Sequence, residues 1–472
     1  MRVLIFHGYL LGGTGSNVYN ARLAAALVEL GHEVHLFCQD RQPERQAFVD
    51  AAGDWEGGKL RVQVLREPIG CTAYRPDLGG LLPVYVMDRY EGIEARTFAE
   101  CSDEEVKRYI AANVAAVREV VELVQPDVAL ANHLVMGPVI LARALAGAVP
   151  FAVKVHGSAL EYTVKPNPER FLGLAREGLA GANAVLVGSH HTAASLWEAL
   201  EDPQLEERTR LGPPGVDIAR FGPREAAQAA KAVPALARRL RAQAKGSDGA
   251  EASAFARDDL AAAQALERLE PGRDRLVVFV GKLIANKGVD LLLAAWPLVC
   301  AREPAARLVV VGFGAERERF LAVAAALDER VSERVIFTGR LDHEELTELL
   351  PACEALVVPS IFPEAFGMVA AEAAACGVFP VSAAHSGLAE VSDTLARHIP
   401  AEAAGWLSFA IDDGAVEALA ACLIGWLEAD PELRAKTRAG LVEAVREHWS
   451  WEGVARGVIA AASGELDDLA VP

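Results

Sequence analysis

The chain lacks features that define several common protein classes. Its seven cysteines are scattered and include no C-x-x-C pair, which disfavours a disulfide scaffold and indicates reduced thiols. No apolar run is long enough to span a membrane. Basic residues are few, with 46 lysines and arginines against 65 acidic residues, and the net charge of −19 disfavours binding to nucleic acid or to an anionic membrane. We therefore expect a soluble cytoplasmic protein.

Several catalytic motifs are also missing. The chain has no H-E-x-x-H, G-x-S-x-G or P-loop motif, and no D-x-D pair that would clamp a metal. A glycine-rich loop, Gly12–Ser16, follows the first apolar run, but the sixth residue counted from Gly13 is Val18 rather than Gly or Ala. The nicotinamide-dinucleotide fingerprint therefore fails, and the sequence predicts neither a metal site nor a nicotinamide cofactor.

Apolar runs alternate with helical segments through most of the chain, which is typical of α/β folds with parallel sheets. At 472 residues the chain is too long for a single core, and the alternation restarts after the turn at Pro213–Gly215. We predict one doubly wound, Rossmann-like domain over residues 1–215, a linker with an Ala-rich helical insertion over 216–272, and a second such domain over 273–451. The predicted strands are Val3–Phe6, Glu33–Cys38, Val128–Ala131, Phe151–Val155, Ala184–Val187, Leu276–Val280, Arg307–Val311, Val335–Thr338, Ala355–Val358 and Val378–Ser382.

Three segments depart from this alternation. Residues 41–102 are rich in Gly, Pro and charged residues, and such a long insertion at a sheet edge predicts a functional loop or a lid. Residues 223–270 are rich in Ala, Arg and Glu, and they predict two helices around a flexible turn at 245–249. The segment from Pro431 to about Ala462 is predicted to be helical.

The stretch Pro359–Glu372 carries the most chemical information. A buried strand leads into a turn that ends at Gly367, and a run of strong helix formers follows. Such a helix start binds phosphate through free backbone N–H groups, here expected from Phe366 to Val369. Glu364 and Glu372 flank this start, and carboxylates beside a phosphate site suit a ligand that also carries hydroxyl groups, as a nucleotide sugar does.

Two lysines follow the first strand of the second half. Lys282 and Lys287 lie five residues apart, and parallel strands place their carboxyl ends at one edge of the sheet. The lysines can neutralise a diphosphate at that edge. Glu364 would then hold hydroxyls of the sugar, and Glu372 those of the ribose.

The first half offers further candidates for ligand contact. Gly12 and Gly13 allow the backbone to approach an anion closely at a helix start. His156 and His133 each follow a predicted strand, where a histidine can hydrogen-bond a substrate hydroxyl or a leaving oxygen. Ordinary helix capping is the alternative at both positions. The candidate acceptor contacts, with ordinary loop packing as the alternative, are His133, Tyr74, Arg75, Arg89 and Tyr90.

Together these motifs resemble the retaining glycosyltransferases of family 4, which have the GT-B fold, and the resemblance covers nearly the whole chain. The pair Glu364 and Glu372 is the most specific match. The other matching segments are Gly12–Gly15, His156-Gly157, Pro214–Asp217 with Phe221, Gly281–Gly288, Val311–Gly314 and Phe337–Leu341.

The resemblance implies two Rossmann-like domains that face each other across a cleft, with a C-terminal helix, about 452–472, that crosses back to the first domain. It also implies a UDP-, GDP- or ADP-sugar bound mainly by the second domain and a small-molecule or glycan acceptor bound mainly by the first. Transfer would proceed with retention and without a metal.

The resemblance also assigns roles by position. Lys282 and Lys287 would hold the diphosphate, and Glu372 the ribose. The remaining assignments are the backbone of Arg340 and Leu341 for the base, Glu364 with the amides of Phe366, Gly367 and Met368 for the sugar, and His156 near the leaving oxygen. Two residues depart from the family pattern: Lys282 stands where Arg is usual and loses bidentate phosphate geometry, and Pro214 stands where Asn is common.

Alternatives remain open on the sequence. An epimerase acting on nucleotide sugars shares the fold and needs no acceptor, and a non-catalytic nucleotide-sugar sensor would keep the binding residues. Retention without an obvious nucleophile favours front-face attack, in which the leaving diphosphate takes the acceptor's proton; double displacement with Glu364 as nucleophile is the alternative. The acidic charge and the lack of a basic amphipathic segment favour a soluble acceptor over a lipid.

Overall fold

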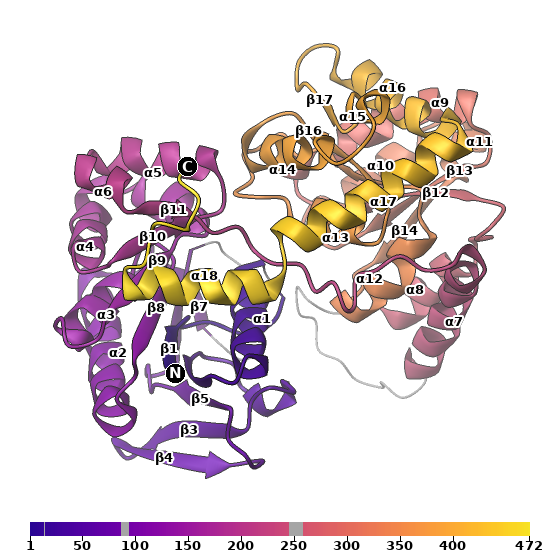
Figure 1. The fold of residues 1–472 in the computed structure, drawn as a ribbon. Coiled ribbons are helices and arrows are strands. Elements are labelled where there is room, and N and C mark those ends of the chain that lie inside the picture. Colours follow the sequence, from indigo (N-terminus) through magenta and orange to yellow (C-terminus); the bar gives the residue numbers. More distant parts are fainter. Residues whose placement is uncertain (14, 86–93, 245–257) are drawn as a thin grey trace. The chain divides into compact units, whose positions relative to one another are not determined.

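The structure is a computed structural model that describes residues 1–13, 15–85, 94–244 and 258–472. The chain forms two compact units. Met1–Gly215 together with Trp451–Pro472 make up unit 1, and Val216–Ser450 make up unit 2. Each unit has its own sheet, covered by helices (Figure 1).

A nine-stranded sheet is the centre of unit 1. Its strands are β1 (Arg2–Phe6), β2 (Glu33–Phe37), β3 (Ala51–Glu56), β4 (Lys59–Val64), β5 (Cys71–Arg75), β8 (Val128–Asn132), β9 (Phe151–Lys154), β10 (Ala184–Val187) and β11 (Thr209–Leu211). Their order is β11-β10-β9-β8-β1-β2-β5-β3-β4, and neighbours pair in parallel except in the β3–β4 hairpin. A separate parallel pair is formed by β6 (Leu81–Val84) and β7 (Glu94–Thr97).

Both faces of the unit 1 sheet are buried. Along β1, Leu4 and Phe6 belong to one apolar cluster and Val3 and Ile5 to another, because successive side chains of a strand point to opposite faces. Burial on both sides explains why the strand reads as a continuous apolar run. The helices of unit 1 are α1 (Gly15–Glu29), α2 (Asp103–Val124), α3 (Gly137–Leu145), α4 (Pro168–Ala180), α5 (His190–Leu200), α6 (Pro203–Glu207) and α18 (Trp451–Ser463).

The C-terminal helix α18 belongs to unit 1, as the family resemblance implies. It packs against α1, β8, β9 and β10 (Figure 1). The sequence predicts one helical segment from Pro431 to about Ala462, whereas the structure has α17 (Pro431–His448) in unit 2 and then α18. Trp449 lies at the break, is buried, and accepts the Val216 N–H at its carbonyl at 2.7 Å. This bond to the linker uses a carbonyl that a continuous helix would need.

Six parallel strands form the sheet of unit 2. They are β12 (Arg275–Val280), β13 (Ala306–Val311), β14 (Val335–Gly339), β15 (Ala355–Val358), β16 (Phe379–Ala383) and β17 (Ser408–Phe409). Their order is β14-β13-β12-β15-β16-β17, so the chain builds the sheet in one direction from β12 and in the other from β15. Doubly wound sheets bind ligands at such a reversal, outside the carboxyl ends of the strands.

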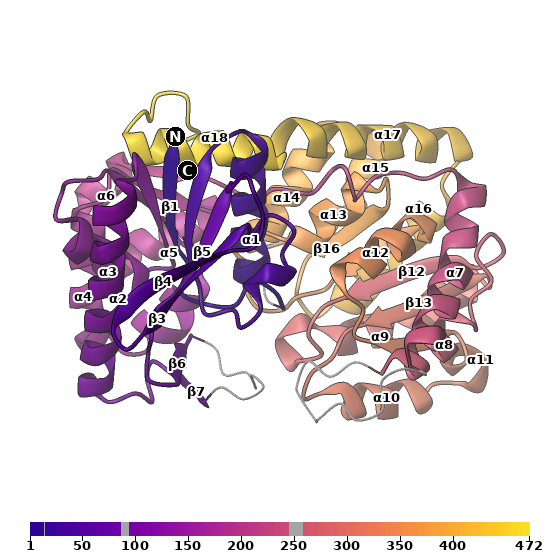
Figure 2. The same cartoon turned by 90° about the horizontal axis from the view of Figure 1, so that it is seen from below.

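Helices cover both faces of the unit 2 sheet. Figure 2 shows α13 (Met368–Ala375) and α17 on one face, with α9 (Val289–Arg302) and α10 (Arg317–Ala325) on the other. The core contains the fully buried side chains of Trp296 and Trp426. The other helices of four or more residues in unit 2 are α7 (Ala226–Ala244), α8 (Asp259–Leu266), α11 (Glu329–Ser332), α12 (His343–Leu349), α14 (Ser386–Ala396), α15 (Ala401–Ala404) and α16 (Ala415–Glu428).

The Ala-rich segment is helical, as the sequence predicts. Helices α7 and α8 pack against each other and contribute Val233, Leu236 and Leu266 to the core of unit 2. The turn expected at 245–249 lies outside the described residues.

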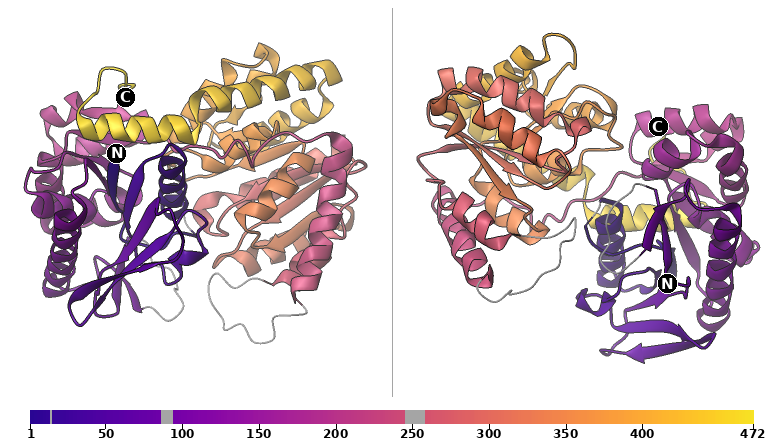
Figure 3. Two further views of the ribbon diagram at one scale, coloured as in Figure 1. Left: turned by 60° about the horizontal axis from the view of Figure 1, so that its bottom comes forward. Right: turned by 180° about the vertical axis from the view of Figure 1, so that it is seen from behind.

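The prediction of a loop or lid over residues 41–102 was wrong for much of its described part. β5 pairs with β2 and β3, and the β3–β4 hairpin extends the sheet to its edge (Figure 3). Cys71, Ala73 and Tyr74 of β5 are buried, so the segment contributes to the core. Its Gly, Pro and charged residues concentrate in the turns and hide the short strands from a composition argument.

The described residues bear on the expectations about membrane spans and cysteines. None of their helices combines the length and apolarity needed to cross a membrane. All seven cysteines lie among them, and these cysteines form no disulfide with one another. Six of the seven are buried, as the sequence predicts.

We expect Gly440→Ala to destabilise unit 2. A Cβ at Gly440, in α17, would lie 2.1 Å from the carbonyl oxygen of His398, which is backbone and cannot rotate away. Overpacking of this kind costs about 1–3 kcal/mol, so thermal unfolding should show a melting temperature lower by roughly 2–10 °C. The matched control is Gly457→Ala in α18, where the Cβ would meet Leu469 at an ordinary 3.6 Å. Equal melting temperatures for the two variants would contradict this packing.

Candidate functional site

The loops that follow β12 and β15 meet at the strand-order reversal of unit 2. The Ile361 N–H donates to the Asn286 carbonyl at 3.0 Å, which ties the two loops together. Across the same junction, Lys287 forms a hydrogen-bonded ion pair with the Oε1 atom of Glu364. The exposed fractions of the two side chains are 31% and 25%, so the pair can be reached from solvent.

Two glycines permit the loops at this edge of the sheet to approach closely. Gly288 has φ +65°, and a Cβ there would lie 1.9 Å from the Pro359 carbonyl oxygen. Gly312, after β13, has φ +152°, and its Cβ would lie 1.8 Å from the Gly281 carbonyl oxygen. Only glycine fits at either position. A side chain at Gly288 would push apart the loops that carry Lys287 and Glu364, and one at Gly312 would push apart the loops after β12 and β13.

Helix α13 starts four residues after Glu364. Gly367 precedes it with φ +138°, and Met368 and Val369 form its first turn, where backbone N–H groups lack helical partners. Phe366 is buried and meets Trp449 edge-to-face at 5.3 Å between ring centroids. The structure therefore brings together the predicted helix start, Glu364 and Lys287, with half-buried Lys282 in the loop after β12.

Glu372 has a partner that was not predicted. His343, in the first turn of α12, donates Nε2–H to Glu372 Oε1 at 2.8 Å, and the Glu372 side chain is only 5% exposed. The ring of Phe221 packs edge-on against His343 at 5.1 Å. The His343 side chain is 32% exposed, so the pair can be reached from solvent through its imidazole. A ligand that approaches Glu372 would meet both groups.

The two residues predicted to hold a base follow β14. Arg340 pairs with Asp342 at 2.9 Å, and its guanidinium lies 5.9 Å from the ring centroid of Phe313. Leu341 is buried. The Arg340 side chain is 24% exposed, and the backbone contact to a base that the resemblance implies stays a prediction.

Three residues that support Glu364 were not predicted from the sequence. The Glu364 N–H donates to Ser386 Oγ at 2.9 Å, and Ser386 and His385 Nδ1 are in hydrogen-bond contact at 3.1 Å. His385 Nε2 donates to the Ser360 carbonyl at 2.8 Å, and Ser360 Oγ–H donates to Glu364 Oε1 at 2.7 Å. These bonds form a closed ring. The sequence does contain a pattern that could have indicated Ser386. It starts a helix just after β16, in the same strand–turn–helix arrangement that drew attention to Glu364.

In unit 1 the strand order reverses between β1 and β8, and His7 lies at the carboxyl end of β1. His7 Nε2–H donates to the Leu10 carbonyl at 2.9 Å and to Asn17 Oδ1 at 3.0 Å, and Nδ1 accepts from Asn20 at 3.0 Å. Burial lowers the pKa of His7 to about 4. His7 is therefore a neutral residue that holds the loop after β1.

The two predicted histidines lie together near His7. The rings of His133 and His156 are 5.0 Å apart, and His156 Nε2–H donates to Asn132 Oδ1 at 2.8 Å. His133 is buried, and neither ring nitrogen has a hydrogen-bond partner among the described residues. Burial is the main cause that lowers the pKa of both histidines well below the usual range, so both are neutral at pH 7. Neutral imidazoles suit hydrogen bonding to hydroxyls.

Glycines 12 and 13 lie exposed in the loop before α1. The Gly12 carbonyl accepts from Asn17 Nδ2 at 2.7 Å, and Gly13 has φ +91°. The backbone of this loop is thus accessible and held by Asn17, which His7 also contacts.

Two of the other candidate acceptor contacts, Tyr74 and Arg75, are engaged within the sheet of unit 1. Tyr74 is buried in β5 with its hydroxyl 3.2 Å from His35 Nδ1. Arg75 makes a bidentate ion pair with Asp54 at 2.6 and 2.7 Å. Both residues therefore have structural roles within the sheet, and we do not retain them as acceptor contacts. Arg89 and Tyr90 lie outside the described residues.

One group among the described residues brings three possible metal-ligating atoms within 4.8 Å of one another: His398, Glu447 and His448. His398 Nε2 and Glu447 Oε2 are 3.3 Å apart, and Glu447 and His448 are both exposed. An ordinary ion pair accounts for this geometry. The group does not include any residue of the loops that carry Lys287 and Glu364.

Two family models match the chain. The Glycosyl transferase 4-like domain matches residues 14–204, within unit 1, and the Glycosyl transferases group 1 model matches residues 264–446, within unit 2. The chain belongs to the group 1 glycosyltransferases. His133 and His156 lie within the region matched in unit 1, and the loops around Glu364 lie within the region matched in unit 2.

Sequences of other glycosyltransferases are similar over different lengths. The D-inositol 3-phosphate glycosyltransferase of Segniliparus rotundus is 36% identical over 45% of each chain. The GDP-mannose-dependent monoacylated alpha-(1-6)-phosphatidylinositol monomannoside mannosyltransferase of Corynebacterium glutamicum is 34% identical over 36% of this chain and 42% of its own. The chain thus spans less than half the length of these two relatives. A D-inositol 3-phosphate glycosyltransferase from Frankia alni is 28% identical over 80% of this chain and 85% of its own.

Solved structures of glycosyltransferases share the fold. Sucrose-phosphate synthase from Thermosynechococcus elongatus has a TM-score of 0.61 at 21% identity and covers 97% of this chain and 96% of its own. Anabaena HepE in complex with UDP and glucose has a TM-score of 0.61 at 17% identity, over 98% and 99% of the two chains. At these identities the likeness shows the fold alone, which is GT-B.

We expect the buried Lys154 to make the stability of unit 1 depend on pH. Lys154, at the end of β9, donates to the Gly212 carbonyl at 2.5 Å, and burial lowers its pKa from 10.5 to about 7. Between these values the unfolded chain binds more protons than the folded one, so the contribution of Lys154 to stability rises with pH through this window. The melting temperature of the wild type relative to Lys154→Met should therefore fall as the pH drops from about 9 to about 6.

The control for this comparison is Lys107→Met, which replaces an exposed lysine of unit 1 that pairs with Glu104 at 2.9 Å. Its melting temperature should follow that of the wild type at a constant offset over the same pH range. A constant offset for Lys154→Met as well would show that Lys154 does not titrate in this window.

Proposed function

We propose that the protein transfers a sugar from a nucleotide-diphosphate sugar to a hydroxyl group of a soluble acceptor, with retention of anomeric configuration and without a metal ion. The observation that carries the proposal is the partly exposed Lys287–Glu364 pair, which lies at the strand-order reversal of unit 2 beside the first turn of α13. Positive charge for a diphosphate and a carboxylate for hydroxyls are thus supplied within one loop junction. The complex of HepE, which shares the fold, with UDP and glucose supports this donor class.

We assign each part of the donor, namely the diphosphate, the sugar, the ribose and the base, to residues of unit 2. Lys282, Lys287 and the amides of Met368 and Val369 bind the diphosphate, since cations and a helix N-terminus both favour anions. Glu364, with the backbone of Phe366 and Gly367, binds hydroxyls of the sugar. The other two assignments are the His343–Glu372 pair for the ribose and the backbone of Arg340 and Leu341 for the base.

We favour front-face attack for the chemical step. The bond between the anomeric carbon and the diphosphate oxygen breaks, the acceptor oxygen bonds to that carbon from the same face, and the leaving diphosphate takes the acceptor's proton. Lys287 and Ser360 both donate to Oε1 of Glu364, and a carboxylate oxygen held by two donors is a weakened nucleophile. This argues against double displacement through Glu364. Stabilisation of the leaving diphosphate by Lys282, Lys287 and α13 then carries most of the catalysis.

The acceptor is assigned to unit 1, at the neutral histidines. His156 is half-buried and offers its imidazole to a ligand hydroxyl, and His133, whose buried ring nitrogens have no partner among the described residues, lies beside it. Gly12 and Gly13 offer backbone contacts in the adjoining loop. The relatives named above include enzymes for D-inositol 3-phosphate and for a phosphatidylinositol mannoside, so soluble and lipid acceptors are both found among them.

We favour a soluble acceptor, in the cytoplasm, where reduced thiols are usual. The net charge of −19 opposes docking on an anionic membrane. The structure does contain one basic amphipathic helix, α7, which the sequence argument overlooked. Its buried side chains, among them Val233 and Leu240, pack in the core of unit 2, so that face is not available to lipid.

A panel of UDP-, GDP- and ADP-sugars should identify the donor by thermal shift. A ligand that binds only the folded state stabilises it by about 2.7 kcal/mol at a concentration of 100 Kd. One nucleotide should therefore raise the melting temperature selectively, and Lys282→Ala should reduce that shift. The absence of a shift with every member of the panel would contradict a nucleotide-sugar site.

Turnover should depend on the loop junction of unit 2. Lys282→Ala and Glu364→Gln should each lower kcat/KM about 10²–10³-fold with the donor identified above, because each removes charge stabilisation at the reacting groups. The control is Lys436→Ala, which removes an exposed lysine paired with Glu432 on α17 and should leave turnover unchanged. Near-normal turnover of both site variants would refute the assignment.

The product of this assay also reports the stereochemistry. The configuration at the anomeric carbon of the product, read by NMR coupling constants, should be that of the donor. An epimerised donor formed without acceptor would instead favour the epimerase reaction.

A further inference from the structure

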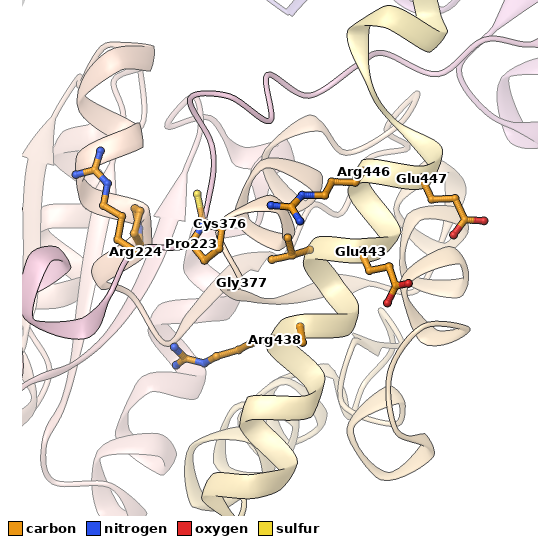
Figure 4. A pocket seen from close by; sticks show the side chains of 11 residues that line it. Pro223, Arg224, Cys376, Gly377, Arg438, Glu443, Arg446 and Glu447 are labelled. Atoms are coloured by element: carbon orange, nitrogen blue, oxygen red, sulfur yellow. The ribbon is translucent and has the colours of Figure 1, made fainter.

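Unit 2 contains a cavity away from the loops after β12 and β15. It has a volume of about 820 Å³ and is lined by the segment before α7, the C-terminal end of α13 and one side of α17 (Figure 4). Helix α13 separates the two regions: its N-terminus lies beside Glu364, and Cys376, which follows its last turn, lines the cavity. Its eight residues span about 12 Å, so this cavity is distinct from the proposed donor site.

Three arginines line this cavity in a chain whose net charge is −19. Arg438 and Arg446 come from α17, eight residues apart and therefore on one side of the helix, and Arg224 comes from the segment before α7. In Figure 4 the side chains of Arg438 and Arg446 extend from α17 toward the side of the cavity that holds Cys376 and Pro223.

The arginines are incompletely neutralised by neighbouring carboxylates. Arg438 donates to Glu354 at 2.6 Å, but the same carboxylate also pairs with Arg434 at 3.3 Å and lies 3.7 Å from Arg275. Burial lowers the pKa of Arg434, and the charges of Arg275 and Arg438 lower it further. Within the described part of the chain, Arg446 and Arg224 have no ion pair or hydrogen bond through their guanidinium groups.

The remaining polar groups of the cavity do not compete for this charge. Glu443 and Glu447 also line it, but Figure 4 shows their carboxylates directed to the opposite side of α17, and Glu447 pairs with His398 at 3.3 Å. Burial raises the pKa of the Cys376 thiol to about 12, so it is neither an anion nor a nucleophile at pH 7. The negative end of the α13 dipole opposes an anion, but it amounts to about half a charge against three guanidinium groups.

We propose that this cavity binds a phosphorylated small molecule. Arg446, Arg224 and Arg438 bind the phosphate, because guanidinium groups match phosphate geometry through paired N–H donors. Val442, Pro351 and the backbone at Gly377 contact the remainder of the molecule. The site is independent of the donor site, so it stands whether or not the reaction proposed above is correct. The phosphate can come from a free metabolite or from a lipid headgroup.

Isothermal titration of the full chain with glucose 6-phosphate and with inorganic phosphate tests the proposal. Glucose 6-phosphate should bind the wild type, and Arg446→Gln and Arg224→Gln should each weaken binding at least tenfold. Two controls separate this site from others. Arg456→Gln removes an exposed arginine of α18 that pairs with Glu452 at 2.7 Å and should leave the affinity unchanged. Lys282→Ala should also leave it unchanged, because Lys282 belongs to the donor site.

Flotation with neutral phosphatidylcholine vesicles, with and without phosphatidylinositol phosphate, distinguishes the sources of phosphate. Flotation that requires the phosphorylated lipid and is lost in Arg446→Gln would support the site with a lipid headgroup as its ligand. The proposal is overturned if neither the soluble probes nor the vesicles bind, if Arg446→Gln binds as the wild type does, or if binding is lost in Lys282→Ala and retained in Arg446→Gln.

Discussion

Gly288 lets the loop after β12 approach the loop after β15 so closely that any side chain at this position would overlap the Pro359 carbonyl. Lys287, the preceding residue, thereby reaches Glu364, which is 77 residues further along the chain. The reversal of strand order between β12 and β15 places both loops at one edge of the sheet. The proposed donor site depends on these two conditions, since neither loop alone combines the cation, the carboxylate and the helix start.

The ring of hydrogen bonds around Glu364 gives that carboxylate a fixed position. Ser360, His385 and Ser386 connect its backbone N–H to its own carboxylate oxygen through the loops after β15 and β16. A carboxylate held in this way is preorganised to accept hydroxyl donors. In unit 1, burial keeps His7, His133 and His156 neutral, so these residues also offer hydrogen bonds rather than charge. The formal charge of the proposed reaction is thus handled by the lysines of unit 2.

Sequence reasoning worked best where burial is complete. β10 and β15 are buried on both faces and read as short apolar runs, so their positions were confirmed. It failed where local composition conflicts with tertiary packing. β3 to β5 were missed because their turns are polar and glycine-rich, and one helical segment was expected where Trp449 binds the linker instead. Tyr74 and Arg75 were misread as loop residues for the same reason, since β5 places them within the sheet.

The sequence by itself determined the order and the ends of the buried strands that read as apolar runs, and the residue types at those ends, because these follow from local periodicity and turn chemistry. Only the tertiary structure decided which side chains form hydrogen bonds and ion pairs with one another. His343 bonds to Glu372 across 29 residues, Ser386 to Glu364 across 22, and three arginines share Glu354 across as many as 84. Such pairs depend on which strands are neighbours and on how closely glycines let their loops approach, and neither property is encoded in any local window of the chain.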